Sequence, residues 1–232
     1  MKLTILNSQL SILLISFTIH MKIFGLLLLL SPIITSAQVS QVESFNTISG
    51  QPFFPKQYQD VNGTPYLFEE WTPSTIVLEN GSALKDVRTN FNLVTNELLY
   101  LDEQGKTMVA KPSVIRSVEV KSAKARKFIT THAKNSYLEV VSSEGKATLL
   151  KHQKKVILET KPYNSATVQK NFKTSETIMV EVAGNLTEVK STSDLLEVLT
   201  PAEELKDFAK EQRLKSRSVD SWVKIVDHYN TL

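Results

Sequence analysis

Short runs of β-branched and aromatic residues alternate with turn residues along most of the chain. One run, at residues 76–78, meets Asn80 and Gly81, a pair that is the strongest short hairpin signal. Alternation at period two turns one face of each strand toward a core. The pattern predicts an antiparallel meander, with further strands at residues 83–88, 91–94, 98–101, 107–110, 114–120, 137–141, 147–150, 178–182 and 186–190, and an extension at 156–158.

The period changes to about 3.6 near Ser191, where apolar residues recur at helical spacing. We expect Ser193 to cap a first short helix, and Thr200 with Pro201 to start a second. Ser218 is expected to cap a third. Because a short helix is marginal in water unless its apolar face is buried, we expect two or three short C-terminal helices packed on the sheet.

These elements define a mainly β fold with helices at the C-terminus. We predict an antiparallel β domain over residues 63–190, formed as a sandwich or a partly closed barrel, and a helical segment over residues 191–232. Residues 38–62 contain Pro52 and Pro55 and are predicted to be extended. The sequence contains no repeat and no low-complexity linker, which argues against separate domains.

The first residues have the features of a bacterial export signal. Lys22 precedes an apolar run over residues 23–30, and small residues lead up to Ala37. We therefore interpret residues 1–37 as a signal peptide that is cleaved after Ala37. Met21 begins a complete signal by itself, which favours it as the true start. The alternative is an uncleaved membrane anchor, against which the charge of Lys22 argues.

Composition is that of an ordinary folded chain. Of the 232 residues, 41% are hydrophobic and 22% are charged. The chain has no cysteine, which excludes disulfides, thiolate metal ligands, a cysteine nucleophile and the lipid-acceptor cysteine of a bacterial lipoprotein. Lys and Arg total 27 against 24 Asp and Glu, and two of the lysines lie in the signal peptide, so the exported chain is nearly neutral.

Motifs for catalysis, metals and cofactors are absent from the sequence. His132, His152 and His228 are scattered, and neither a G-x-S-x-G elbow nor H-E-x-x-H occurs. Residues 60–63 resemble the start of a calcium loop but lack its distal glutamate, so we interpret them as a turn. We expect no catalytic residue, no metal site and no cofactor site, and we do not expect an enzyme.

The best candidate for ligand contact is the cluster of Glu69, Glu70 and Trp71, where two carboxylates adjoin an aromatic ring. Adjacent residues on a strand point to opposite faces, so the two glutamates are not expected to share one site. We keep the three residues as weak binding candidates. The simpler interpretation is an edge carboxylate beside a core tryptophan.

Basic residues gather at residues 121–127 and 151–155. Such clusters can follow a polyanion such as lipopolysaccharide or nucleic acid. Because no aromatic residues are interleaved for base stacking, we interpret both clusters as solvated loops and exposed edges, and we expect no nucleic-acid partner.

Several segments together suggest a relationship. The stretch Gly63–Leu67 with Trp71, the Asn80–Gly81 hairpin and the stretch Phe91–Leu98 resemble a family of exported Bacteroidetes proteins of unknown function. Members of that family are similar in ending on a charged helical tail with a Tyr-Asn pair, here Tyr229–Asn230. The resemblance implies export and a β domain followed by helices. It implies no activity.

We therefore expect a non-catalytic binding or interaction module of the bacterial envelope, periplasmic or at the cell surface, with an envelope protein, a lipid or a glycan as partner. No stable transmembrane segment is expected after signal cleavage. One alternative is a structural subunit of a surface or secretion assembly, with the helix around Trp222 packed on another chain. A less favoured alternative is a hydrolase whose acid and base, Glu69 or Glu70 with a histidine, meet across the sheet.

The signal peptide leads to a direct prediction. N-terminal sequencing of the protein found outside the cytoplasm should begin at Gln38, because the signal peptidase accepts small residues before the cut. An intact Met1 or Met21 in that form would contradict the assignment.

Overall fold

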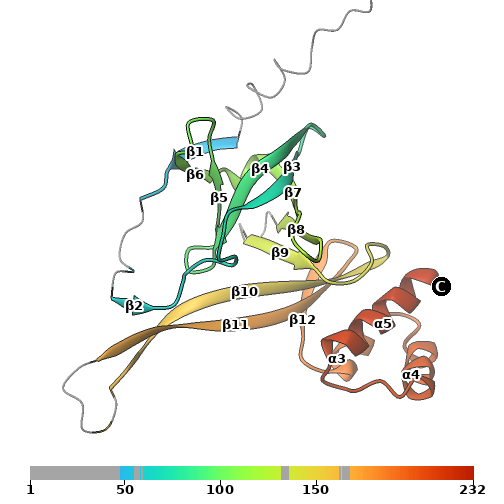
Figure 1. The fold of residues 1–232 in the computed structure, drawn as a ribbon. Coiled ribbons are helices and arrows are strands. Elements are labelled where there is room, and N and C mark those ends of the chain that lie inside the picture. Colours follow the sequence, from blue (N-terminus) through green and yellow to red (C-terminus); the bar gives the residue numbers. More distant parts are fainter. Residues whose placement is uncertain (1–47, 55–57, 59, 132–135, 162, 164–167) are drawn as a thin grey trace, which may run out of the picture. The chain divides into compact units, whose positions relative to one another are not determined.

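The computed structural model describes residues 48–54, 58, 60–131, 136–161, 163 and 168–232 (Figure 1). The predicted signal peptide, its cleavage site after Ala37 and the first of the three mature histidines, His132, lie outside the described residues. No helix within the described ranges is long and apolar enough to span a bilayer.

The described chain forms one large sheet of 12 strands, followed by three helices. The hydrogen-bonded order is β1-β6-β5-β4-β3-β7-β8-β9-β10-β11-β12, and β2 joins β11 from outside this path. The mainly β fold with C-terminal helices is confirmed, and the sheet is not closed. The strands are β1 (Ser49–Pro52), β2 (Val61–Asn62), β3 (Thr72–Leu78), β4 (Ala83–Asn92), β5 (Glu97–Leu101), β6 (Thr107–Ala110), β7 (Ile115–Val120), β8 (Arg126–Thr131), β9 (Ser136–Val140), β10 (Ala147–Thr160), β11 (Gln169–Val182) and β12 (Asn185–Val189).

The part of the sheet from β4 to β9 curls around a first hydrophobic core. The ring of Phe91 on β4 lies 4.4 Å from that of Phe128 on β8 and 5.4 Å from that of Tyr137 on β9, between ring centroids. These strands are not neighbours in the hydrogen-bonded order. The sheet must therefore bend until strands distant along it face each other across the core.

A second core lies where β10, β11 and β12 meet the helices α3 (Thr192–Val198), α4 (Ala202–Glu211) and α5 (Val219–Thr231) (Figure 1). Leu149 and Val180 of the sheet belong to this core together with Leu205 and Trp222 of the helices, and all four are buried. The indole Nε1 of Trp222 donates a hydrogen bond to the carbonyl of Ser216 at 3.0 Å. The apolar stripe of α5 is therefore packed within its own chain.

The starts of the first two helices differ from the prediction. Ser191, and not Ser193, caps α3, because its hydroxyl accepts from the backbone N–H of Asp194 while the Asp194 carboxylate accepts from the backbone N–H of Ser191. The hydroxyl of Ser191, which donates to the Asp194 carboxylate at 2.7 Å, and then the backbone N–H of Lys190, which donates to it at 2.8 Å, lower the pKa of Asp194. Pro201, and not Thr200, occupies the N-cap position of α4. Ser218 is the N-cap of α5, as predicted, although its side chain makes no capping bond.

The longest hairpin is much longer than predicted. β10 and β11 pair without interruption from Ala147 opposite Val182 to Thr160 opposite Gln169. β8 was not predicted at all. In both stretches few side chains are buried, so the alternation of apolar and polar residues that marks a strand is weak.

The turn between β9 and β10 is fastened to the last helix. The side-chain amide of Asn230 donates to the carbonyl of Ala147 and accepts from its N–H, each at 2.9 Å. The carboxylate of Asp227 accepts from the N–H of Ser143 at 2.8 Å. A Cβ at Gly145 would lie only 2.6 Å from Cγ of Asn230, so this turn requires glycine there.

Replacing Asn230 with alanine should lower the free energy of unfolding by about 1 to 3 kcal/mol, because it leaves backbone groups of Ala147 without their partners. Urea unfolding followed by circular dichroism measures this. The control is Gln169→Ala, which removes an exposed amide and should change stability by less than about 0.5 kcal/mol. Equal losses in the two variants would contradict the role of Asn230.

Candidate functional site

Residues 64–71 lead into β3 alongside the end of β4 through a series of bends, and we call this segment the strap. The backbone N–H of Leu67 donates to the carbonyl of Phe91, and that of Leu93 donates to the carbonyl of Pro65, each at 2.9 Å. Tyr66 and Asn92 form an isolated antiparallel bridge. The strap thus takes the place of a neighbouring strand beside the last residues of β4.

Asn90 holds the middle of the strap. Its side-chain oxygen accepts from the N–H of Phe68 at 3.1 Å, and its side-chain nitrogen donates to the carbonyl of Phe68 at 2.9 Å. The amide of Asn90 is buried and satisfies both backbone groups of one strap residue. The strap is therefore fixed at a set distance from β4.

Lys155 of β10 holds the beginning of the strap. Its ammonium group donates to the carbonyls of Thr64 and Tyr66 at 2.8 and 2.7 Å, and its backbone N–H donates to the carbonyl of Leu93 at 2.9 Å. Partial burial lowers the pKa of Lys155. The long hairpin and the strap are thereby joined at one residue.

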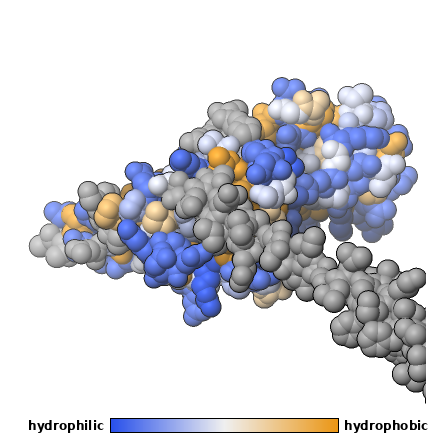
Figure 2. Space-filling model, turned by 90° about the horizontal axis from the view of Figure 1, so that it is seen from above, coloured by the Kyte–Doolittle hydropathy of each residue, from blue (hydrophilic) through white to orange (hydrophobic). Residues whose placement is uncertain are grey.

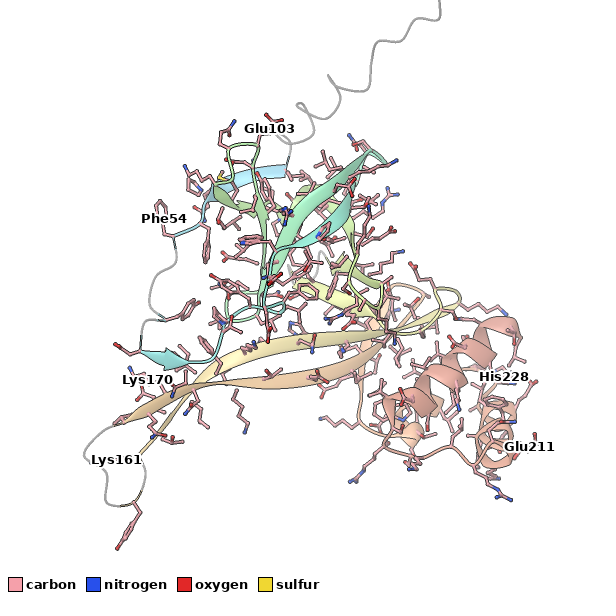
Figure 3. The ribbon with its side chains drawn as sticks, viewed as in Figure 1. Phe54, Glu103, Lys161, Lys170, Glu211 and His228 are labelled. Carbon is pink, nitrogen blue, oxygen red and sulfur yellow. The ribbon has the colours of Figure 1, made fainter. Side chains whose placement is uncertain are left out.

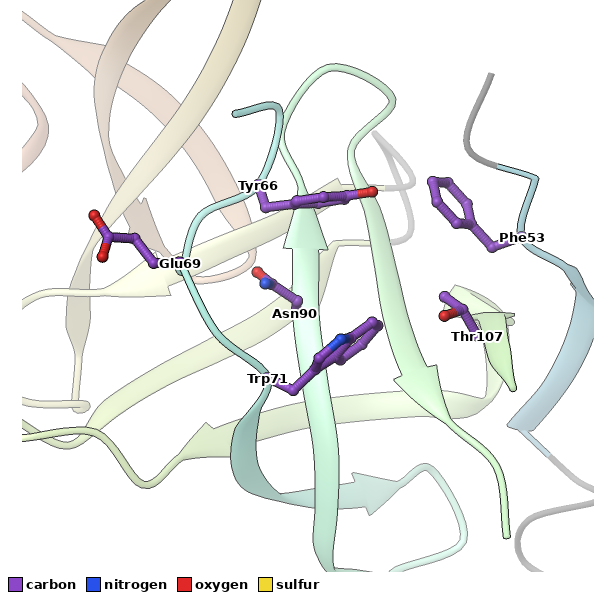
Figure 4. Close-up of a pocket in the computed structure, with 6 residues that line it drawn as sticks. All are labelled: Phe53, Tyr66, Glu69, Trp71, Asn90 and Thr107. Carbon is purple, nitrogen blue, oxygen red and sulfur yellow. The ribbon is translucent and has the colours of Figure 1, made fainter. Parts of the chain in front are cut away.

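A pocket of about 220 Å³ lies beside the strap. Figure 4 shows the rings of Phe53, Tyr66 and Trp71 gathered on one side of the strap, with Thr107 beside them. The carboxylate of Glu69 points away from these rings (Figure 4). The residues that line the pocket are Phe53, Tyr66, Glu69, Trp71, Asn90 and Thr107.

The aromatic walls come from separate parts of the chain. Phe53 follows β1 and is placed by a hydrogen bond from its N–H to the carbonyl of Thr107 on β6, at 3.1 Å. Its ring meets that of Tyr66 edge to face, with 6.5 Å between the ring centroids. Burial, and secondarily the nearby Tyr58, raise the pKa of Tyr66. The neighbouring Phe54 is 68% exposed and is not among the residues that line the pocket.

The structure separates the three predicted binding candidates. Trp71 forms a wall of the pocket, and Glu69 borders it with its carboxylate turned outward. Glu70 is exposed and is not part of the lining. Sequence reasoning missed Phe53, Tyr66, Asn90 and Thr107, because residues so distant in sequence give no local pattern. The only available signal was the aromatic residue next to Pro52.

A compact charge cluster lies behind the strap. Arg126 donates to both carboxylate oxygens of Glu139, at 2.6 and 2.8 Å, and the ammonium of Lys151 lies 2.9 Å from the same carboxylate. The guanidinium carbon of Arg126 lies 5.3 Å from the ring centroid of Phe68, a strap residue, and 5.2 Å from that of Phe128. This cation–π contact connects the strap to the inner face of the sheet.

The pKa of Glu139 is the outcome of opposing effects. Burial by itself would raise the pKa, but the hydrogen bonds and positive charges of Arg126 and Lys151 outweigh it and hold the pKa below the usual range. The carboxylate is therefore ionised at neutral pH. It is a buried structural anion, and its two cationic partners occupy it fully.

The same contacts correct the interpretation of the basic clusters as solvated loops and edges. Arg126 and Lys151 lie on strands and are partly buried against Glu139, and Lys155 is bound to the strap. Lys121 and Lys127 form ion pairs with Asp86 and Glu144, both at 2.6 Å. Four of these basic side chains, Lys121, Arg126, Lys127 and Lys151, are therefore paired with carboxylates of the same chain.

Metal ligands do not gather in the described part of the chain: no group there of three or more His, Asp or Glu side chains is arranged to hold an ion. His228 stacks on Phe208 with 4.0 Å between ring centroids, which places it on the helices. None of the described residues that line the pocket is a histidine.

Comparison of the chain with protein-family models, with curated proteins and with solved structures finds no match. The site must therefore be interpreted from its own chemistry.

The buried anion generates a prediction about pH. Because the folded pKa of Glu139 lies below its unfolded value of about 4.3, its pairing stabilises the protein above that pH, and the stabilisation is lost as pH falls through the folded pKa. Glu139→Gln should lower the free energy of unfolding by about 3 kcal/mol at pH 7 and should weaken its dependence on pH below about 4. Urea unfolding across pH 3 to 7 measures both effects.

The matched control is Glu188→Gln, which breaks the exposed ion pair with Lys190. That change should alter stability by less than about 0.5 kcal/mol. A loss at pH 7 that is no larger for Glu139→Gln than for this control would contradict the role assigned to the buried cluster.

Proposed function

We propose that the protein is a non-catalytic binding module whose pocket holds a neutral ring-shaped ligand, and that this ligand is a sugar residue of a glycan. The observation that carries the proposal is the convergence of Phe53, Tyr66 and Trp71 beside Thr107. Aromatic rings bury the apolar face of a flat ligand, and the hydroxyl groups of Tyr66 and Thr107 can exchange hydrogen bonds with its rim.

The charge of the pocket supports a neutral ligand. Like an ordinary tyrosine, Tyr66 has a neutral phenol at pH 7, and the carboxylate of Glu69 is turned away from the rings. The cationic groups nearest the strap are engaged, Arg126 with Glu139 and Lys155 with backbone carbonyls. An anionic or cationic ligand would enter this pocket without a partner for its charge, at a cost in desolvation.

The size of the pocket supports a single ring. Its volume of about 220 Å³ lies below the range of about 300 to 1,000 Å³ that is usual for drug-sized ligands. A longer glycan would place one residue in the pocket and extend the others over the surface.

The rigidity of the pocket favours binding over catalysis. Asn90 and Lys155 fix the strap that carries Tyr66 and Trp71, which lowers the entropy lost when a ligand binds. The outward carboxylate of Glu69 offers no acid or base at the rings, so the hydrolase alternative has less support. In agreement with the predicted signal peptide, we propose that binding takes place outside the cytoplasm.

The sequence contains two tryptophans, which makes the test direct. In the variant Trp222→Phe, Trp71 is the only fluorophore of its kind. Titration with neutral oligosaccharides should change its emission in a saturable way. Tyr66→Ala in the same background should weaken binding about thirtyfold, as expected for truncating an aromatic anchor worth about 2 kcal/mol.

The control variant is Phe54→Ala, which removes the exposed aromatic residue next to the pocket and should leave affinity unchanged. Circular dichroism verifies that each variant is folded. The proposal fails if neutral oligosaccharides leave the Trp71 emission unchanged, or if Tyr66→Ala and Phe54→Ala have equal effects.

A further inference from the structure

The outer part of the long hairpin projects beyond both cores. We call residues 154–160 of β10 and 169–175 of β11 the arm. Val156 and Leu158 on the arm are 51% and 45% exposed, although Leu149, Leu150 and Val180 of the same strands are fully buried. Large exposed aliphatic side chains on a paired strand require an explanation.

The two faces of the arm differ. Residues directly opposite each other in an antiparallel pair share a face, so Ile157 lies beside Phe172, and Phe172 is packed against Tyr58 with 5.5 Å between ring centroids. The N-terminal segment covers this face in part. The other face places Val156 beside Lys173 and Leu158 beside Asn171, and we call it the open face.

The open face has one sign of charge. Along the arm it consists of Lys154, Val156, Leu158 and Thr160 on β10 and of Gln169, Asn171, Lys173 and Ser175 on β11. It therefore carries two lysines and no acid. The only acid of the arm, Glu159, lies on the covered face, where it forms an ion pair with Lys170 at 3.2 Å.

Apolar and basic groups continue beyond the arm. Tyr163 is 96% exposed and Val168 is 50% exposed, and Lys161 is exposed as well. Figure 3 shows Lys161 and Lys170 on the part of the hairpin farthest from the helices, and Figure 2 shows apolar residues among hydrophilic ones where the molecule tapers at the left of the view.

We propose that the arm docks on an anionic lipid bilayer. In this arrangement Val156 and Leu158 enter the boundary between headgroups and acyl chains, and Lys154 and Lys173 meet the lipid phosphates. The long stems of the lysines lie along the apolar surface while their ammonium groups reach the headgroups. An exposed tyrosine near aliphatic residues suits the same boundary.

The charge of the open face argues against a second copy of the chain as its occupant. Two open faces packed on each other would bring Lys154 and Lys173 of one copy against the same residues of the other. Like charges placed together in an interface are unfavourable, whereas a surface of lipid phosphates is complementary to them.

The test uses the chain from Gln38 onward, which keeps the whole compact unit of residues 41–232 and removes the apolar leader. Sedimentation with vesicles of phosphatidylcholine mixed with phosphatidylglycerol should retain the protein, and added salt should release it. Vesicles of phosphatidylcholine alone should retain little. Lys154→Glu with Lys173→Glu should reduce retention at least roughly fivefold per lysine, and Val156→Ser with Leu158→Ser about tenfold.

The control with matched charge is Lys206→Glu with Lys210→Glu on α4, two exposed lysines that lie away from the arm. It has the same net charge as the double lysine variant of the arm and should bind like the unsubstituted chain. All these changes are at exposed positions, and circular dichroism verifies the fold.

Several outcomes would overturn the proposal. They are no retention by the anionic vesicles, equal loss in the α4 control and in the arm variant, or undiminished retention of both arm variants. Light scattering tests the alternative occupant, a second copy of the chain. The open face is an interface between copies if the unsubstituted chain is a dimer, Val156→Ser with Leu158→Ser makes it a monomer, and vesicle binding is unaffected.

Discussion

The unbroken pairing of β10 with β11 is the interaction on which the rest of the structure depends. At one end of this ladder Ala147 and Val182 lie within the core that the helices complete. In its middle Lys155 holds the strap, and at its far end the same ladder continues into solvent. Because register fixes which face every side chain occupies, a slip of one residue would expose the helix-facing core and release the strap together.

Two side-chain amides form hydrogen bonds with backbone groups that have no neighbouring strand in the curled sheet. A sheet that bends strongly has backbone groups near its edges without a neighbouring strand, and such groups are costly when buried. Asn90 supplies both a donor and an acceptor to Phe68, and Asn230 does the same for Ala147. One amide thus fixes the strap beside the pocket, and the other fixes the last helix beside the hairpin.

Turns formed by adjacent residues could be predicted from the sequence, whereas contacts between residues distant in the sequence could not. The Asn80–Gly81 hairpin forms as expected, because its turn residues are adjacent and their preferences are intrinsic. Trp71 was found as a candidate because it follows two glutamates, yet Glu70 does not line the pocket. Phe53 and Thr107 meet there only after β1 pairs with β6, which no local pattern encodes. The role of Ser191 as a cap depended on Asp194 three residues later.

The amide of Asn90 supports the pocket by holding the strap that forms part of its wall. Asn90 lines the cavity, but both ends of its amide are bound to the backbone of Phe68, so no ligand is needed to explain why it is asparagine. Aspartate would lack the donor, and glutamine would be one methylene too long. A substitution of Phe53 or Thr107 would change only the wall of the cavity, whereas a substitution of Asn90 would also release the strap, because both hydrogen bonds to Phe68 would be lost.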